Sequence, residues 1–385
     1  MNKTYNKNLV FSASCAGLAF FGVTMLSLGL IIPHLKLELG DVVYRLPATL
    51  PIGIIIGTLI FGPVVDRFGY KNLLIVGSVI ALLGVQGLVH LAQFNEMWML
   101  YVSILLVGIG GGILNGETNV LVAEIYDDKT RGGKLGILGA FFCIGALTWT
   151  LMVHVMGDFR LPLNIISAIK VAFVVFYCFI QFPQAKPQSG GASFKDVIGL
   201  LKYPALILFA FVLFFQSGLE AITNTFTPSF LEETKGMGDI ALSLTFVTVG
   251  MLIGRFLLGA IMNKLGDIRT LYIFMSIALI GFILLGFVVS AETPMLVYAA
   301  MALIGFGVGA TFPVVFNSLG ATFKEMSGTA FSIAIFIGLC GNFILKRAMG
   351  WFFERGQFDY LPIVMIFATI MIMILLPLAK SKIKK

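Results

Sequence analysis

The stretch that decides the fold is "GPVVDRFGYKNLL", residues 62–74, which lies between two long apolar runs. It gathers glycines, a proline, an aspartate, an arginine and a lysine in a chain that is 58% hydrophobic and only 12% charged. Such a cluster predicts a tight turn between two helices, with Gly62 allowing a close helix contact. Asp66 suits the N-terminal end of a neighbouring helix, while Arg67 and Lys71 suit an anionic membrane surface.

Apolar runs like the two that flank this turn recur along the whole chain of 385 residues. Each is about 20 residues long, which is the length that a helix needs to span a bilayer. An ordinary soluble domain is nearer to about 25% charged. The pattern predicts twelve transmembrane helices, with little chain left for a soluble domain. The expected spans are 9–33, 47–64, 73–94, 98–122, 135–156, 163–182, 205–230, 241–259, 271–290, 295–318, 329–350 and 360–379.

Positive charge is distributed unevenly along the chain. If the N-terminus lies in the cytoplasm, 18 of the 26 lysines and arginines fall in cytoplasmic loops or tails. Cytoplasmic loops of membrane proteins carry such an excess of positive charge. We therefore expect both termini in the cytoplasm, and we attribute the net charge of +7 to the membrane surface and not to nucleic acid.

The longest predicted cytoplasmic segment is "PQAKPQSGGASFKDVIGLLKYP", residues 183–204, which is rich in proline, glycine and serine at its start. This composition is typical of a linker. A short amphipathic helix is expected from about Ser193. The chain then divides into a first six-helix bundle at 1–182, the linker at 183–204 and a second six-helix bundle at 205–385.

The two predicted bundles share sequence motifs at a constant separation. "GPVVDRFG" begins at Gly62 and "GAIMNKLG" at Gly259, and the two are 197 residues apart. "GIGGG" begins at Gly108 and "GFGVG" at Gly305, again 197 residues apart. Related halves in a membrane protein are typical of secondary transporters, whose solute site lies near the middle of the membrane where the repeats meet.

The motif G-x-x-x-D-R-x-G-Y-K at 62–71, between the second and third spans, resembles the signature loop of the major facilitator superfamily. The resemblance covers essentially the whole chain. It implies an all-α membrane protein with two pseudo-symmetric six-helix bundles around a central cavity, working by alternating access. It also implies a latch that holds the cytoplasmic side in the outward-facing state. The latch residues are Gly62, Asp66, Arg67, Gly69 and Lys71. In the second copy Asn263 and Lys264 replace the acid and the arginine, so we expect a weaker second latch.

Four further stretches resemble helices of the fucose–proton symporter group. They are "GIGGGILNGETNVLV" at 108–122, "GAFFCIGAL" at 139–147, "FFQSGLEA" at 214–221 and "GFGVGATFP" at 305–313. The resemblance implies pathway residues at Asn119 and Glu220. That group carries an acid in its first helix near the position of Gly29, where this chain has none. This difference argues against fucose as the solute and against that group's mode of proton coupling.

The predicted seventh span, 205–230, carries a continuous polar stripe. Gln216, Glu220 and Asn224 follow one another at four-residue intervals, and Thr223 and Thr227 lie on the same side. A carboxylate in the middle of a membrane costs about 2.5–3.5 kcal/mol, so it is rarely kept without a function. The stripe predicts a cavity-facing pathway for solute and protons, although hydrogen bonding to a neighbouring helix explains the same pattern.

The predicted fourth span, 98–122, holds Asn115 and Asn119 on one face and Glu117 about 200° away around the helix. Because only one face can point into a cavity, we place the two asparagines there. Glu117 then faces a helix of its own bundle. A structural or gating role and a role in the pathway both remain open for it.

The remaining candidates lie in the second half of the chain. Asn317 and Asn342 are polar residues of the tenth and eleventh spans, and we expect them to line the pathway. Lys346 and Arg347 follow in the outer half of the eleventh span. They suit either an anionic solute or the outer membrane interface, to which long basic side chains extend. We favour the interface.

These observations predict a secondary active transporter, and not an enzyme, that moves a small polar solute such as a sugar with protons across a bacterial cytoplasmic membrane. An efflux pump is the alternative, because 36 phenylalanines and 17 methionines suit an adaptable apolar pocket. A membrane-embedded enzyme would need clustered catalytic or metal-binding residues, which the sequence lacks, and a non-transporting receptor would share the pattern. We expect no cofactor, no metal and no nucleic acid. The expected partners of this monomer are the solute, protons and the lipid bilayer.

Overall fold

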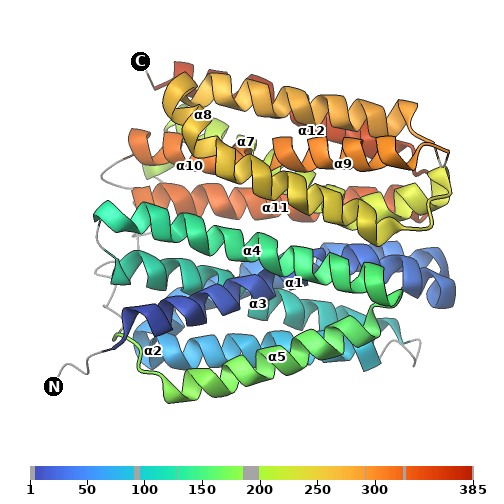
Figure 1. Cartoon of the computed structure of the whole chain (residues 1–385). Coiled ribbons are helices and arrows are strands. Elements are labelled where there is room, and N and C mark those ends of the chain that lie inside the picture. The colour runs from blue at the N-terminus through green and yellow to red at the C-terminus, as the bar shows by residue number, and fades with distance from the viewer. Residues whose placement is uncertain are drawn as a thin grey trace. The chain divides into compact units, whose positions relative to one another are not determined.

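The structure is a computed structural model that describes residues 5–90, 96–126, 128–184, 199–290, 292–323 and 327–383. Within these ranges it describes no side chain at 62–63, 66, 128–129, 131–133, 259–260, 263 and 327–329. Every regular element in this part of the chain is a helix (Figure 1). Most of the predicted linker, including the start of its short helix, lies outside the described residues.

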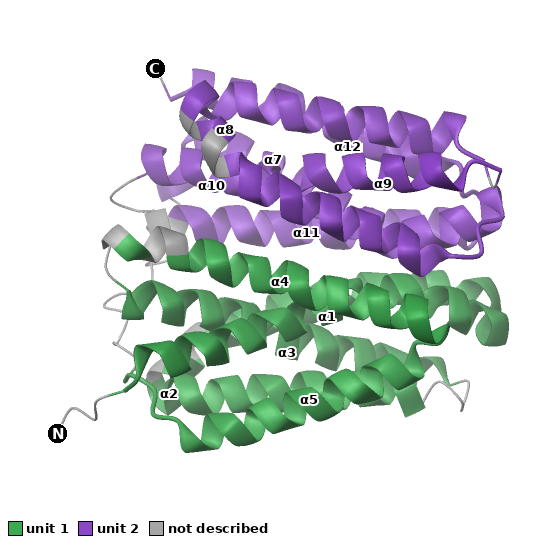
Figure 2. Ribbon diagram, viewed as in Figure 1, with its two compact units in different colours: residues 1–188 green, residues 189–385 purple. Residues whose placement is uncertain are grey.

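The chain divides into two compact units, Met1–Gln188 and Ser189–Lys385 (Figure 2). The first unit contains α1 (Lys7–Leu39), the 3-10 segment η1 (Gly40–Ala48), α2 (Thr49–His90), α3 (Met97–Ile125), α4 (Asp128–Met156) and α5 (Arg160–Phe179). The second contains α7 (Pro204–Lys235), α8 (Ile240–Ile283), the π-helical segment η3 (Leu284–Val288), α9 (Pro294–Val308), α10 (Thr311–Thr322), α11 (Ser327–Phe353) and α12 (Tyr360–Ser381).

Eleven segments of the described chain are long and apolar enough to cross a membrane. The first of them, Lys7–Phe61, has 55 residues and includes α1, η1 and the first part of α2. At about 1.5 Å per residue it is more than twice as long as the ~30 Å thickness of a hydrocarbon core, so it accounts for two crossings. The all-α architecture is confirmed. The eleven segments agree with the twelve predicted spans, because Lys7–Phe61 crosses the membrane twice.

Large apolar side chains are exposed on the helices of both units. Leu83, Phe179 and Phe256 have 61%, 82% and 71% of their surface exposed. Apolar surface on this scale is unfavourable in water and favourable against lipid. Backbone polar groups are paired within each helix, as hydrocarbon surroundings require. The chain is therefore a multi-pass membrane protein.

The repeat predicted from the motifs is present in the backbone. Gly69 interrupts α2 with φ 76° and ψ 164°, and Gly266 interrupts α8 with φ 74° and ψ 170°. The two positions are 197 residues apart, which is the separation of the sequence motifs. Residues with a side chain rarely adopt such a positive φ, so in each unit a glycine makes the turn between two spans.

Glycines also repeat at the closest helix contacts. A Cβ atom on Gly108 of α3 would lie 2.4 Å from the carbonyl oxygen of Leu50 in α2. A Cβ atom on Gly305 of α9 would lie 1.9 Å from the carbonyl oxygen of Val247 in α8. Only a residue without a side chain permits these approaches. The "GIGGG" and "GFGVG" motifs therefore bring the same pair of helices together in each unit.

The tenth predicted span is broken in the structure. α9 ends at Val308 and α10 begins at Thr311, with Gly309 and Ala310 between them. Three glycines in five residues at 305–309 lower the helix propensity. Pro313 has no N–H to donate to the carbonyl four residues earlier. The break leaves backbone carbonyl groups that side chains of neighbouring helices can reach.

Candidate functional site

The polar stripe of α7 contacts the break between α9 and α10. Gln216 is buried, and its Nε2 donates a hydrogen bond of 3.0 Å to the carbonyl oxygen of Val308, the last residue of α9. Its own Oε1 has no hydrogen-bond partner among the described residues. Gln216 thus satisfies a carbonyl at the helix break and keeps one acceptor for another molecule.

Glu220 lies one turn after Gln216 and is partly exposed. Two neighbours act on its carboxyl group, namely the charge of Arg255 on α8 and a hydrogen bond from Gln216. The sequence pattern does not single out Arg255, because nothing in the sequence shows that α8 packs beside the stripe. Arg255 is therefore the neighbouring charge that an ionised Glu220 faces.

The other members of the stripe are buried in the second unit. Thr223 donates a hydrogen bond of 2.7 Å to the carbonyl oxygen of Leu219, so its own helix satisfies it. Asn224 and Thr227 are 5% and 0% exposed, and the Thr227 hydroxyl has no partner within the described chain. The stripe therefore holds two polar oxygens, on Gln216 and Thr227, that a hydroxyl-bearing solute can satisfy.

Asn115 and Asn119 lie side by side on α3, as their spacing predicts. Asn119 Nδ2 donates to the carbonyl oxygen of Asn115 at 2.8 Å and to its Oδ1 at 3.2 Å. Asn119 is exposed on its unit, and Asn115 is partly exposed. The two side chains form one polar patch on α3.

Glu117 lies on the opposite side of α3 and is completely buried. Neither of its carboxyl oxygens has a hydrogen-bond partner in the described part of the chain. On the same side of α3, a Cβ atom on Gly110 would lie within 2.6 Å of Gly77 and Ala81 in the second half of α2. Glu117 therefore points into the interior of its own bundle.

A second buried charge accompanies Glu117. Lys170 of α5 is 2% exposed and is the cation that acts on Glu117. Its Nζ donates to the Tyr177 hydroxyl at 3.1 Å, and that hydroxyl donates at 3.3 Å to the carbonyl oxygen of Ala13 in α1. The sequence pattern missed Lys170, although a lysine in the middle of an apolar span is itself a signal.

In the signature loop the structure describes the side chains of Arg67 and Lys71; those of Gly62 and Asp66 lie outside the described set. Lys71 Nζ donates a hydrogen bond of 2.6 Å to the carbonyl oxygen of Cys178, next to the end of α5. A cation in this place stabilises the C-terminal end of a helix. Lys71 thus ties the loop to α5 in addition to carrying charge for the membrane surface.

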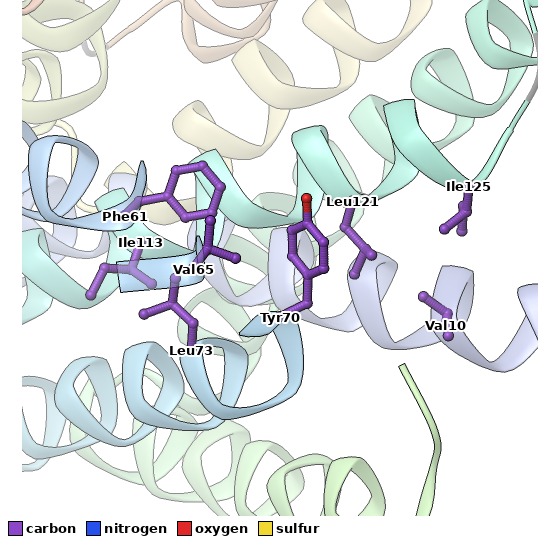
Figure 3. Close-up of a cluster of buried hydrophobic side chains, with 8 residues drawn as sticks. All are labelled: Val10, Phe61, Val65, Tyr70, Leu73, Ile113, Leu121 and Ile125. Atoms are coloured by element: carbon purple, nitrogen blue, oxygen red, sulfur yellow. The ribbon is translucent and has the colours of Figure 1, made fainter. Parts of the chain in front are cut away.

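Tyr70, which follows Gly69, anchors the loop in an apolar cluster (Figure 3). The cluster consists of Val10, Phe61, Val65, Tyr70, Leu73, Ile113, Leu121 and Ile125. These side chains come from α1, α2 and α3. Their burial fixes the turn at Gly69 against the other helices of the first unit.

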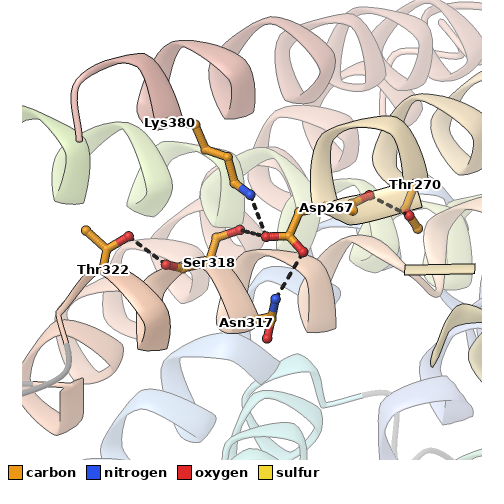
Figure 4. A network of polar contacts seen from close by, with 7 residues as sticks. Asp267, Thr270, Asn317, Ser318, Thr322 and Lys380 are labelled. Carbon is orange, nitrogen blue, oxygen red and sulfur yellow. Dashed lines mark hydrogen bonds and ion pairs between the residues drawn. The ribbon is translucent and has the colours of Figure 1, made fainter. Parts of the chain in front are cut away.

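The corresponding turn in the second unit is held by polar groups (Figure 4). Asp267, which follows Gly266, accepts hydrogen bonds of 3.0 Å from Asn317 and 2.8 Å from Ser318, both in α10. It also forms an ion pair with Lys380 of α12. The structure thus places the Asn317 side chain in a contact between α8 and α10. The sequence pattern missed Asp267, because its partners are distant in the chain.

Asn342 and Lys346, one turn apart on α11, are 4% and 1% exposed. Arg347, the next residue, is exposed. The interpretation that both basic residues extend to the membrane interface is therefore wrong for Lys346, because a side chain that reaches the interface cannot be enclosed by its own protein. The interface remains a suitable place for Arg347.

The family model described as the Major Facilitator Superfamily matches residues 12–345. The chain belongs to this superfamily. The match includes the signature loop, both glycine motifs, the polar stripe of α7 and most of α11. The protein is therefore a membrane transporter and not an enzyme.

Individual relatives support the same conclusion. A glucose/galactose transporter of Brucella abortus is 23% identical over 355 residues, which cover 84% of each chain. The structure is similar to the Escherichia coli fucose–proton symporter FucP, with a TM-score of 0.66, 17% identity and coverage of 96% and 98% of the two chains. A D-xylose–proton symporter has a TM-score of 0.77, 16% identity and coverage of 98% and 99%. The two structural similarities confirm the major facilitator fold.

Proposed function

We propose that this transporter moves a small polar solute, a sugar or a related metabolite, together with protons across a bacterial cytoplasmic membrane. The observation that carries the proposal is the stripe of α7, where Gln216, Glu220 and Thr227 offer one titratable group and two unsatisfied oxygens. Relatives named for glucose, galactose, fucose and xylose support a sugar.

The solute part of the proposal follows from the unsatisfied oxygens. A buried polar atom without a partner is costly, and a ligand that donates a hydrogen bond to it removes that cost. Gln216 Oε1 and Thr227 Oγ1 are such atoms on α7. Hydroxyl groups of a sugar match this set, since each can donate and accept.

Glu220 is the proposed proton carrier. When the site is open to water, the ionised carboxylate is hydrated and attracted to Arg255. When the site closes, an unprotonated carboxylate would remain in surroundings where charge is costly, so protonation favours closure. A carboxyl group that is hydrated on alternate sides of the membrane can bind a proton on one side and release it on the other.

We place both termini in the cytoplasm, and the signature loop with them. The excess of positive charge, 18 of 26 lysines and arginines, supports this orientation. The loop is the proposed latch, in which Asp66 biases the equilibrium between conformations without touching solute. The turn at Gly69 and the hydrogen bond from Lys71 to Cys178 support a rigid loop that can act in this way.

Glu220→Gln tests the proposal, because glutamine mimics the protonated acid and cannot release the proton. The protein is reconstituted into liposomes, and uptake of labelled sugars is followed with and without a pH gradient, beginning with glucose and galactose. We expect the wild type to accumulate solute when the gradient is imposed. We expect Glu220→Gln to exchange solute across the membrane but to reach only equal concentrations on both sides.

Glu292→Gln is the matched control, because Glu292 is an exposed acid in the loop before α9. It should accumulate solute as the wild type does. Accumulation by Glu220→Gln at the wild-type level would exclude Glu220 as the coupling group, and Glu117→Gln would then be the next variant to measure. Failure of the wild type to transport any sugar or sugar derivative would contradict the proposed function itself.

A further inference from the structure

Lys346 is a buried cation without a counter-charge. Its side chain in α11 is 1% exposed, and no hydrogen bond or ion pair joins it to any residue that the structure describes. The other buried lysine of the described chain, Lys170, donates to the Tyr177 hydroxyl and lies beside the ring of that residue. Among the described residues, Lys346 has no hydrogen-bond partner or aromatic neighbour of this kind.

An ammonium group that leaves water loses solvation free energy, which a partner of opposite charge can restore. Charged residues inside membrane spans commonly face pathways for solutes or ions. A lysine that folding encloses without a partner is therefore a candidate for a group whose partner arrives with a bound molecule.

One polar side chain lies on the same side of α11 as this lysine. Asn342, one turn before Lys346, is 4% exposed and its Oδ1 has no partner among the described residues. α7 runs beside α11, because a Cβ atom on Gly341 would lie 2.1 Å from the carbonyl oxygen of Phe214. Further along, the rings of Phe226 and Phe353 lie 4.9 Å apart.

Two hydroxyl groups of α7 face the same helix. Gly218 marks the side of α7 that contacts α11, since a Cβ atom there would lie 2.2 Å from the side chain of Leu345. Thr225 and Ser229 follow at spacings that bring both within about 20° of the direction of Gly218. Both hydroxyl oxygens are buried and have no partner within the described chain. This set is distinct from the stripe of Glu220, which lies on the other side of α7.

We propose that Lys346 is an anion subsite that binds the carboxylate of the transported solute. The inference rests on the proposed function and deepens it: the solute is a sugar acid or a hydroxy acid and not a neutral sugar. The ammonium group forms a charge-assisted hydrogen bond with the carboxylate. Asn342, one turn away on the same helix, offers an acceptor to a hydroxyl group of the same solute.

The single charge of Lys346 also selects among anions. One ammonium group balances one carboxylate, whereas a phosphate ester carries about −1.5 to −2 at neutral pH and would leave negative charge uncompensated in the membrane. Arg347 does not add to the subsite, because its side chain is exposed. A monocarboxylate is therefore the class of ligand that this position fits.

The test compares D-glucuronate with D-glucose, which differ in the carboxylate at one carbon, and adds D-gluconate and D-galacturonate. Binding to the purified full-length protein is measured as the ligand-dependent shift in Tm. For each variant, the Tm with ligand is compared with the Tm of the same variant without ligand. This is necessary because removing an unpaired buried charge changes stability by itself. At least one carboxylate should bind the wild type more tightly than glucose does. Lys346→Gln should weaken that binding by at least about 30-fold.

Arg347→Gln is the matched control, since it removes a neighbouring positive charge that is exposed. It should leave the affinity within about twofold, and Lys346→Arg should retain part of it. Unchanged carboxylate binding in Lys346→Gln would overturn the inference, as would a wild type that binds glucose and none of the three acids. Transport of neutral sugars alone would likewise reject this subsite but keep the proposed transport function. A carboxylate that binds through Lys346 but is never transported would also overturn the inference, because the subsite would not serve the transported solute.

Discussion

Replacement of Gly305 by alanine should force α9 away from α8. The added Cβ atom would lie 1.9, 2.7 and 2.9 Å from the oxygen, carbon and Cα atoms of Val247. Carbon and oxygen atoms that are not bonded approach to about 3.3 Å. The two helices must therefore separate by roughly 1.4 Å at this point. All three obstructing atoms are backbone, so no side-chain rotation relieves the contact.

The expected cost follows from this geometry. Overpacking of a tight contact costs about 1–3 kcal/mol, and we expect the upper end because the obstacle is a helix backbone. A loss of about 3 kcal/mol lowers Tm by roughly 6–12 °C for a unit of this size. Gly108→Ala, in the corresponding contact of the first unit, should cost somewhat less, because its Cβ atom would lie 2.4 Å from the carbonyl oxygen of Leu50.

Gly139→Ala in α4 is the matched control, because no atom lies within 4 Å of its added Cβ. Alanine is favoured over glycine within a helix by up to about 1 kcal/mol, so this variant should melt at or above the temperature of the wild type. The measurement is thermal unfolding of the detergent-purified variants, followed by circular dichroism. If Gly305→Ala melts within about 2 °C of the wild type, the contact at Gly305 does not constrain the packing of α8 and α9.

Two further predictions concern the signature loop and the orientation of the chain. Asp66→Asn should slow transport while leaving solute affinity within about threefold, because the latch changes the balance of conformations and not the site; normal turnover at equal amounts of protein in the membrane would contradict this. A reporter that is active only outside the cytoplasm, fused after residue 385, should be inactive, and activity there would reverse the proposed orientation.

Much of the fold could be predicted from the sequence, because the constraints that set it are local. A helix must carry about 20 apolar residues to cross the membrane, and the runs show this directly. Glycine is needed where φ is positive or where helix backbones touch, so Gly69, Gly266, Gly108 and Gly305 mark the turns and contacts of both units. The broken tenth span was missed, since glycines in a membrane helix indicate close packing as often as a break.

The candidate site was less accessible, because it depends on contacts between residues distant in the sequence. The spacing of Gln216, Glu220 and Asn224 predicted one polar face. Nothing in that spacing showed that Val308 and Arg255 would lie beside it. A lysine and an arginine that are adjacent in the sequence, as in α11, point in different directions on a helix, so one is buried and the other exposed.

Corresponding residues of the two units show which features of the turn the fold requires. Tyr70 and Asp267 are 197 residues apart and follow the same turn. Leu121 and Ser318, also 197 residues apart, lie in the surroundings of these two residues. Tyr70 and Leu121 belong to an apolar cluster, whereas Asp267 and Ser318 belong to a polar network, so the same backbone turn is held in two chemically different ways. The turn therefore depends on its glycine and on a well-packed neighbour, and not on the polarity of that neighbour.

The same comparison bears on the polar residues of α3. Glu117 corresponds to Val314 of α10 at the separation of 197 residues, and both are completely buried. Asn119 corresponds to Phe316, whose ring stacks with that of Phe331 at 4.8 Å. Because apolar residues occupy these places in the second unit, the repeated fold does not require a carboxylate or an amide there. A buried carboxylate is costly in a membrane, and its apolar counterpart shows that the cost is avoidable. Its presence in only one half therefore reflects a requirement of the first unit alone, where Lys170 is the cation that acts on it.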